Sequence, residues 1–377
     1  MDLSVRLGSL QLKNPIVVSA GPWARDAQSI QRCIDQGAGA VTTETITLEA
    51  NPNISPRMYV HGEQTLNTKM FSDLHLEQWE GEFERIKKGD CKLICSIWGN
   101  SASEISYLAA KATHMGADAV EVSMSSPIRN RAFSMEPKHV NALLCAAVKA
   151  AAGIPVIAKL SYEACNSVEF TREVYAAGVR IVSAIDGLKG LAGVDIEQRR
   201  SVMPTYGGFN GSSIHPLALA TTATLKQYTP FYICSCGGTL NYEQVLEFIM
   251  LGASCVALAS VIQINGYGAI SRVIADCVDF LQTHGCSSVS ELQGVALPSL
   301  HPFEDIEPQP LCASAVKACA QDSCNVCTNG CLYDAISRQE AGEIFIDPKR
   351  CTGCGHCVAR CPEQLLMMEW NRLGETR

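Results

Sequence analysis

The sequence lacks features that would assign it to several other classes of protein. Its 377 residues contain no stretch of about 18 or more apolar residues without charges, so no transmembrane helix is expected. It has no long run of Lys and Arg, and its formal net charge of −8 argues against nucleic acid or an anionic membrane as the main partner. The start, MDLSVRLGSL, has no basic segment followed by an apolar one. We therefore expect a cytoplasmic protein.

A dinucleotide fingerprint is also missing, whereas a strand-then-helix rhythm is present. Apolar runs typical of buried parallel strands occur at 15–20, 40–44, 92–97, 119–124, 155–160, 180–185, 231–236 and 255–260. No G-x-G-x-x-G follows any of them, which disfavours a doubly wound open sheet. Eight strands with helical segments between them predict an α/β fold, a (β/α)8 TIM barrel with its active site at the C-terminal strand ends. The opening VRLGSLQL predicts a small hairpin below the barrel.

The cysteines are unevenly distributed. Of the 19 in the chain, ten are scattered between Cys33 and Cys286, most of them in apolar segments where they are interpreted as small buried hydrophobic residues. The other nine lie between Cys312 and Cys361. Because the chain is long and shows no export signal, this concentration favours metal binding over a disulfide scaffold.

The last cysteine run, CTGCGHCVARCP, has the C-x2-C-x2-C-x3-C-P spacing of bacterial two-cluster ferredoxins. Three of its thiolates bind one [4Fe-4S] cluster and the fourth serves another cluster. The ligands are expected to be Cys351, Cys354 and Cys357 for one cluster and Cys361 for the other.

An altered partner motif, CAQDSCNVCTNGCLYDAI, lies upstream. It supplies Cys324, Cys327 and Cys331, the last of which joins the cluster of the downstream run. The expected first ligand is Cys319, displaced to C-x4-C spacing, and Cys312 is the competing candidate. The segments predict a barrel over 1–290, a linker over 291–311 and a small ferredoxin-like domain with two [4Fe-4S] clusters over 312–377.

Two loops at the predicted barrel mouth are suited to phosphate. The sequence CGGTLNYEQ places Gly237 and Gly238 between the seventh strand and a helix, and the eighth strand ends in Ala259-Ser260. Barrels bind phosphate at these two loops through backbone N–H groups and a helix N-terminus. With GGFNGSS at 207–213 and Lys159 at the end of the fifth strand, they predict a phosphorylated cofactor across the mouth.

Segments along nearly the whole chain resemble one known family. They are KNPI (13–16), NPNISPR (51–57), LNTKMFS (66–72), VSMSSP (122–127), VIAKLS (156–161), GGFNGSSIHPLAL (207–219), CGGTL (236–240) and SSVSELQG (287–294). They resemble the FMN-binding dihydroorotate dehydrogenase superfamily, and with the cysteine-rich tail they are most similar to the FMN and iron–sulfur subunit of bacterial NAD-dependent dihydropyrimidine dehydrogenase. The resemblance implies FMN contacts at Ser19, Ala20, Thr45, Lys159, Gly208, Gly237, Gly238, Ala259 and Ser260.

The resemblance also implies a catalytic residue and a changed substrate pocket. The residue before the proline of VSMSSP, which exchanges a proton with the substrate in the family, is Ser126. Its structural alternative is a hydroxyl that caps the strand end. Both flanking asparagines are replaced, by Ser123 and Ile128, and the Asn-Thr pair after the sixth strand reads Asp186-Gly187.

Two further residues are expected in the substrate pocket. The lysine that ends the second strand in the family is Glu44, and Asn67 remains from the pyrimidine-binding set. With Asp186, Glu44 predicts a more negative pocket that disfavours orotate and suits a neutral or amine-bearing substrate. Alternatively, Lys69 or Arg129 pairs with an acid and restores a neutral wall.

Three functions are compatible with these residues. The first is an FMN- and [4Fe-4S]-dependent oxidoreductase acting on a CH–CH bond of a small cyclic substrate. The second is a genuine dihydropyrimidine dehydrogenase subunit that reduces uracil or thymine, and the third is a non-catalytic electron-transfer subunit. Each requires a partner, either an FAD/NAD(P)H flavoprotein subunit or a ferredoxin, and an oligomer is expected.

Overall fold

The computed structural model describes residues 1–50, 54–124, 136–321 and 323–370. The chain divides into two compact units, Met1–Leu300 and His301–Arg377. The division falls inside the segment 291–311 that the sequence indicated as a linker. The two units are treated separately below.

Eight parallel strands close the first unit into a barrel, in the order β10-β15-β16-β3-β4-β7-β8-β9. Their bounds are β3 (Ile16–Val18), β4 (Ala40–Thr42), β7 (Lys92–Ile97), β8 (Ala119–Ser123), β9 (Val156–Leu160), β10 (Ile181–Ala184), β15 (Tyr232–Cys236) and β16 (Cys255–Leu258). Each lies within one of the eight predicted runs, so the barrel prediction is confirmed. The runs lack an alternating pattern because parallel strands are covered on both faces.

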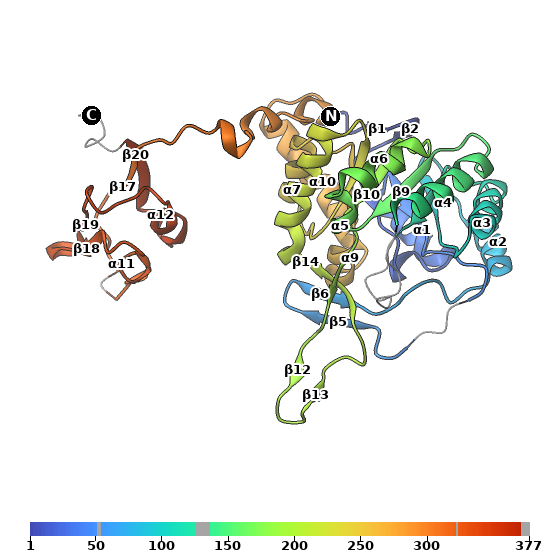
Figure 1. Cartoon of the computed structure of the whole chain (residues 1–377), viewed down its shortest axis with the longest axis horizontal. Coiled ribbons are helices and arrows are strands. Elements are labelled where there is room, and N and C mark those ends of the chain that lie inside the picture. Colours follow the sequence, from blue (N-terminus) through green and yellow to red (C-terminus); the bar gives the residue numbers. More distant parts are fainter. Residues whose placement is uncertain (51–53, 125–135, 322, 371–377) are drawn as a thin grey trace. The chain divides into compact units, whose positions relative to one another are not determined.

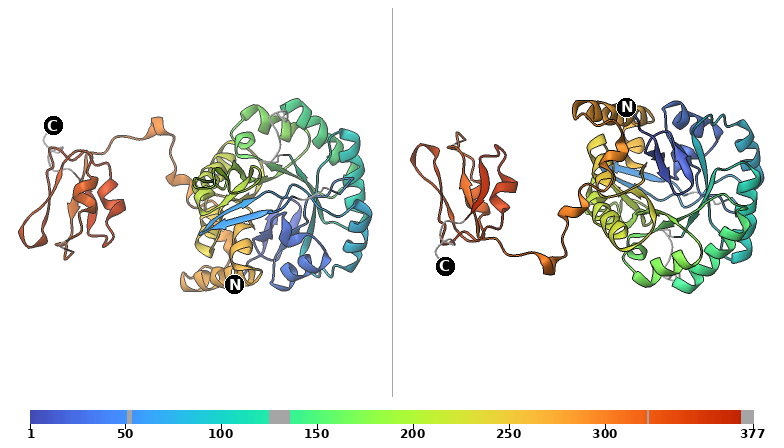
Figure 2. Two further views of the ribbon diagram at one scale, coloured as in Figure 1. Left: turned by 90° about the horizontal axis from the view of Figure 1, so that it is seen from below. Right: turned by 90° about the horizontal axis from the view of Figure 1, so that it is seen from above.

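A ring of helices surrounds the barrel, as Figure 2 shows. They are α1 (Ala27–Asp35), α2 (Leu76–Arg85), α3 (Ala102–His114), α4 (Pro137–Ala150), α5 (Tyr162–Cys165), α6 (Val168–Ala176), α7 (His215–Tyr228), α8 (Tyr242–Met250), α9 (Ser260–Asn265) and α10 (Gly268–Thr283), with short 3-10 turns η1 (Pro22–Ala24), η2 (Ser212–Ile214), η3 (Val289–Leu292) and η4 (Leu297–Ser299). Polar side chains begin several of them. Asp26 accepts from Ser29 N, and Ser101 and Asn241 do the same for Glu104 N and Gln244 N.

The expected hairpin lies at the N-terminal end of the barrel. Strands β1 (Val5–Leu7) and β2 (Leu10–Leu12) pair through a turn at Gly8, which has φ +62°. A Cβ at Gly8 would lie 2.8 Å from Cδ1 of Ile181, the first residue of β10. The hairpin therefore closes the end of the barrel opposite the strand termini expected to carry the site.

A second sheet, which the sequence did not indicate, lies at the barrel mouth. Its order is β11-β14-β6-β5, built from β5 (Met58–His61), β6 (Gln64–Asn67), β11 (Leu188–Gly190) and β14 (Gly207–Gly211). Asn67 and Gly208 are paired across β6 and β14. The hairpin β12 (Val194–Asp195) and β13 (Arg200–Ser201) extends from this sheet in Figure 1. The insertions that follow the second and sixth barrel strands therefore pair with each other at the barrel mouth.

The second unit is small and consists of paired strands and short helices. Strand β17 (Leu311–Ala315) pairs with β20 (Leu366–Trp370), and β18 (Ile336–Arg338) pairs with β19 (Ile344–Ile346). The helices are α11 (Val326–Gly330) and α12 (His356–Arg360), with 3-10 turns at η5 (Phe303–Asp305) and η6 (Glu340–Gly342).

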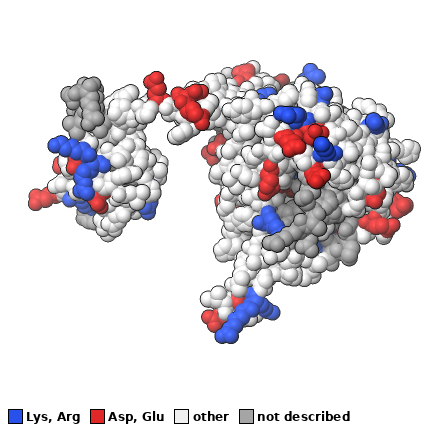
Figure 3. Space-filling model, in the orientation of Figure 1, with Lys and Arg blue, Asp and Glu red and all other residues white. Residues whose placement is uncertain are grey.

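Figure 3 shows Lys and Arg interspersed with Asp and Glu over the face of the barrel unit that it presents. Among the described residues, no helix combines the length and apolar character needed to span a membrane.

Candidate active site and cysteine cavities

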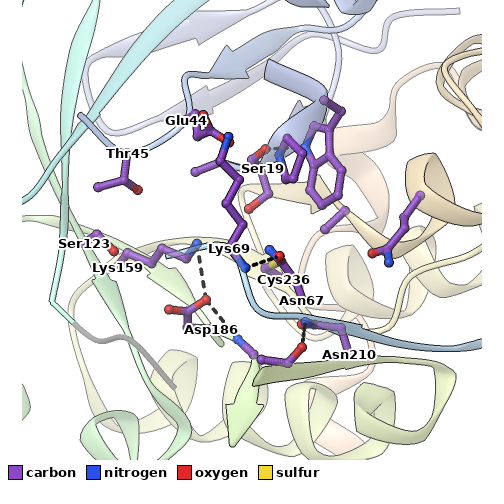
Figure 4. Close-up of a pocket in the computed structure, with 18 of the residues that line it drawn as sticks. Ser19, Glu44, Thr45, Asn67, Lys69, Ser123, Lys159, Asp186, Asn210 and Cys236 are labelled. Carbon is purple, nitrogen blue, oxygen red and sulfur yellow. Dashed lines mark hydrogen bonds and ion pairs between the residues drawn. The ribbon is translucent and has the colours of Figure 1, made fainter. Parts of the chain in front are cut away.

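A cavity lies at the C-terminal end of the barrel, where strand ends meet the additional sheet (Figure 4). The residues expected from the sequence that line it are Ser19, Ala20, Glu44, Thr45, Asn67, Ser123, Lys159, Asp186, Gly208, Ala259 and Ser260. Gly237 and Gly238 do not line it themselves but follow Cys236, which does. Ser126, the expected catalytic residue, and Arg129 lie outside the described residues.

Lys159 and Asp186 form an ion pair in this cavity. Lys159 Nζ lies 3.3 Å from Asp186 Oδ1, with 9% and 17% of the two side chains exposed. Burial acts to lower the pKa of Lys159, but the carboxylates of Asp186 and Glu121 outweigh it and raise the pKa above its usual value. The cavity therefore contains a permanently charged ammonium group at the end of β9.

Glu44 is paired with Lys69, as the sequence analysis allowed. Lys69 Nζ lies 2.7 Å from Glu44 Oε1 and 2.8 Å from Asp73 Oδ1. Burial raises the pKa of Glu44, and the neighbouring ammonium of Lys69 opposes this shift. The expectation of an uncompensated negative wall is therefore wrong, because each acid is matched by a lysine of the same cavity.

A chain of buried hydroxyls connects the cavity to a carboxyl group inside the barrel. Thr45 Oγ1 lies 3.0 Å from Ser96 Oγ, which donates to Glu121 Oε1 over 3.2 Å. Burial raises the pKa of Glu121, while Lys159 acts in the opposite direction. Sequence analysis did not single out Glu121, since a lone acid within an apolar strand gives no motif.

The turn after β15 packs closely against neighbouring segments of the barrel unit. Gly237 and Gly238 have φ +142° and +72°, and a Cβ on Gly238 would lie 2.5 Å from Gly211 O. Two polar atoms, Thr239 Oγ1 and Gln263 Nε2, are buried without a hydrogen-bond partner among the described residues. Gln263 lines the cavity, and an unpaired buried donor at this place fits a phosphate group.

Sequence analysis missed several cavity residues. Asn210 lies in GGFNGSS, which was noted for its glycines only, and its Nδ2 donates to Gly208 O over 3.0 Å. Cys236 was counted among the buried cysteines, but it lines the cavity and burial raises the pKa of its thiol to about 12. The position of Cys236 at the end of the seventh predicted strand could have identified it, whereas Asn210 lies on a strand that the sequence did not indicate.

In the second unit, four cysteines border one apolar cavity. They are Cys319, Cys324, Cys327 and Cys361. Cys319 is held by its backbone N–H, which donates to Gly342 O over 2.9 Å. The altered C-x4-C spacing thus still brings four thiols together.

A second cavity is bordered by Cys331, Cys351, Cys354 and Cys357. Cys312 lines neither cavity. It lies on β17 beside Ala313, whose N–H donates to Cys351 Sγ over 3.5 Å, and burial followed by the nearby Cys351 raises its pKa to about 11. Cys312 is therefore close to the second group of thiols and does not belong to the first.

Comparison with known proteins relates each unit to a family. Residues 2–281 match dihydroorotate dehydrogenase, and residues 318–365 match the 4Fe-4S dicluster domain. The catalytic subunit of dihydroorotate dehydrogenase B (NAD(+)) from Thermococcus kodakarensis is 30% identical over 302 residues, covering 78% of this chain and 98% of the relative. Dihydropyrimidine dehydrogenase (NADP(+)) from Arabidopsis thaliana is 28% identical over 332 residues, covering 78% of this chain and 77% of the relative.

A solved structure supports the fold. The crystal structure of dihydroorotate dehydrogenase from Eimeria tenella in complex with ferulenol superposes with a TM-score of 0.67, at 18% identity, covering 78% of this chain and 88% of that one. At this identity the likeness concerns the barrel architecture.

Proposed function

Because the chain belongs to the dihydroorotate dehydrogenase family, we propose that it is an FMN- and [4Fe-4S]-dependent oxidoreductase acting on a CH–CH bond of a small, neutral cyclic substrate. The observation that carries this proposal is the cavity at the barrel mouth, which combines the buried ammonium group of Lys159 with the unpaired donor of Gln263.

FMN fits the residues that are present. Its phosphate would lie against Gly237, Gly238 and the donors of Thr239 and Gln263, and Lys159 would face the electron-rich edge of the ring. When bound, FMN supplies hydride exchange with the substrate. A buried cation beside the ring favours the reduced, anionic form of a flavin. The remaining expected contacts are Ser19, Ala20, Thr45, Gly208, Ala259 and Ser260.

The substrate wall favours a cyclic amide. Asn67 Oδ1 accepts from Lys69 N over 2.8 Å, which leaves its Nδ2 as a donor, whereas Asn210 uses Nδ2 and leaves its Oδ1 as an acceptor. A donor and an acceptor on neighbouring strands match the C=O and N–H of one amide edge. Both lysines of the cavity are paired with carboxylates, so a neutral ligand suits it better than an anionic one.

Proton exchange with the substrate is assigned to Ser126. A hydroxyl is a weak acid and base, so it requires a relay and a cavity that excludes water. Ser123, Glu44 and Asp186 complete the wall. Asp186 is proposed to position the amide edge together with Lys159.

The cysteine cavities support two clusters. We assign Cys319, Cys324, Cys327 and Cys361 to one [4Fe-4S] cluster, and Cys351, Cys354, Cys357 and Cys331 to the other. Because the sequence has no dinucleotide fingerprint, electrons are proposed to come from a partner FAD/NAD(P)H flavoprotein subunit or a ferredoxin.

The test uses anaerobically purified full-length protein. We expect one FMN and about eight irons per chain, together with slow reduction of the flavin by NADH alone. With an artificial reductant, uracil, thymine, orotate and other unsaturated cyclic amides are compared as oxidants of the reduced flavin. Neutral amides should reoxidise it faster than orotate. Turnover of no compound, with intact cofactors, would instead support an electron-transfer subunit.

Uracil and thymine are themselves neutral cyclic amides, so genuine dihydropyrimidine dehydrogenase activity is the second candidate. The amide pair of Asn67 and Asn210 favours it. Efficient uracil reduction that persists in Asp186→Ala would select it over a different substrate.

A further inference from the structure

The two cysteine cavities share one hydrogen-bond pattern. Ala335 N donates to Cys331 Sγ and Leu365 N donates to Cys361 Sγ, both over 3.3 Å and both from the fourth residue after the cysteine. The two cysteine motifs therefore share a local hydrogen-bond geometry, so equivalent positions of the two cavities can be compared.

The first cysteines of the two motifs differ in the group that donates a hydrogen bond to the sulfur. Cys351 Sγ accepts from the backbone N–H of Ala313 over 3.5 Å. Cys319 Sγ accepts from a side chain instead, since Arg338 Nη2 donates to it over 3.0 Å. Arg338 stands seven residues after Cys331, and the residue seven after Cys361 is the uncharged Met368. The thiols around Cys319 are thus in contact with the guanidinium of Arg338, whereas the equivalent position in the other repeat is occupied by Met368, which carries no charge.

The hairpin of β18 and β19 holds this contact in place. Arg338 ends β18, and Gly342 lies in the connecting turn η6. Gly342 O accepts from Cys319 N over 2.9 Å, and a Cβ on Gly342 would lie 2.3 Å from Cys319 O. Cys319 is therefore hydrogen-bonded to this hairpin through both its backbone N–H and its side-chain sulfur.

A cation at this position affects reduction. One-electron reduction of a [4Fe-4S]²⁺ cluster to the 1+ state adds negative charge to the iron, sulfide and thiolate group. A charged hydrogen bond to a ligand sulfur stabilises the reduced form and raises the reduction potential. Glu363 borders the same cavity and acts in the opposite sense, but it is exposed and solvent screens it.

From this geometry we infer that Arg338 sets the reduction potentials of the two clusters apart, making the Cys319 cluster the one of higher potential. The inference rests on the ligand sets given under the proposed function. Arg338 acts on the cluster indirectly, through its hydrogen bond to Cys319 Sγ. The odd spacing of the first motif then has a role, since it brings Cys319 to the hairpin that carries Arg338.

The experiment is a potentiometric titration of the reconstituted full-length chain, followed by EPR of the reduced clusters. Wild-type protein should show two separate cluster waves. In Arg338→Gln the higher wave should shift to lower potential while the other stays in place. Arg350→Gln is the matched control, because Arg350 pairs with the exposed Asp334 over 3.4 Å and its loss removes the same charge from the same unit.

Equal shifts of both waves, or equal effects of the two variants, would overturn the inference. Should Arg338→Gln assemble one cluster only, the titration is repeated with Arg338→Met, which removes the charge and introduces the side chain that the repeat has at Met368. A lowered upper wave in that variant supports the inference and an unchanged one contradicts it. A wild-type chain with about eight irons and a single wave would also overturn the inference, whereas half the expected iron would refute the ligand sets themselves.

Discussion

Lys69 Nζ lies 2.7 Å from Glu44 Oε1, and about 95% of each side chain is buried (4% and 5% exposed). The family resemblance leads one to expect a lysine at the end of the second barrel strand, where this chain has Glu44. Here a cation reaches the same cavity from the segment after β6. The cavity therefore has a lysine that comes from a different position in the sequence than the family resemblance leads one to expect.

Replacing Lys69 by Met should strongly destabilise the barrel unit, because it leaves Glu44 buried without its counter-ion. Removing one partner of a buried pair costs about 3–5 kcal/mol. We expect a clear fall in the thermal unfolding midpoint and partial recovery in the Lys69→Met, Glu44→Gln double variant. Lys13→Met, which breaks the exposed pair with Asp90, should leave the midpoint nearly unchanged.

Replacing Lys159 by Met should weaken FMN binding and make the flavin harder to reduce. Loss of a charged hydrogen-bonding group typically costs about 1.5–3 kcal/mol, which corresponds to roughly tenfold to a hundredfold in affinity. Fluorescence titration of apoprotein with FMN and a potentiometric titration measure the two effects. Lys189→Met, which removes an exposed lysine from β11, is the control, and equal effects of the two changes would contradict the assignment.

The buried carboxyl group of Glu121 predicts a pH dependence of stability. Because burial raises its pKa, the folded chain binds a proton more tightly than the unfolded chain does. Its contribution to stability is full below the unfolded pKa, about 4.3, and is lost as the pH rises through the raised pKa. Relative to wild type, Glu121→Gln should therefore gain stability with rising pH. Unfolding midpoints of wild type and Glu121→Gln that run parallel from pH 5 to 9 would contradict this.

The ligand sets predict that two nearby cysteines differ sharply in importance. Cys319→Ala should lower the iron content of reconstituted protein from about eight towards about four per chain. Cys312→Ala should leave it nearly unchanged, because Cys312 lines neither cavity. Iron analysis and EPR make the comparison, and the reverse result would transfer the ligand role to Cys312.

The sequence by itself determined the two units and most of the cofactor side of the cavity. Continuous apolar runs report strands covered on both faces, and the barrel brings their C-terminal ends together whatever the loops contain. Lys159 could therefore be placed at the mouth from its position at a strand end, and the family resemblance added Ser19 and Asp186. The cysteine spacing likewise fixed the groups of thiols, apart from the choice between Cys319 and Cys312.

Only the tertiary structure decided how the charges of the barrel cavity are paired and which cysteine joins Cys324, Cys327 and Cys361. Lys69 meets Glu44, and Asn210 reaches the cavity, because two insertions pair as β6 and β14. Arg338 meets Cys319 because the hairpin of β18 and β19 lies against it. These contacts join residues whose spacing carries no periodic signal, and a charge pair or a hydrogen bond depends on where side chains end in space. Sequence patterns report burial and local geometry, whereas such long-range pairings follow from packing.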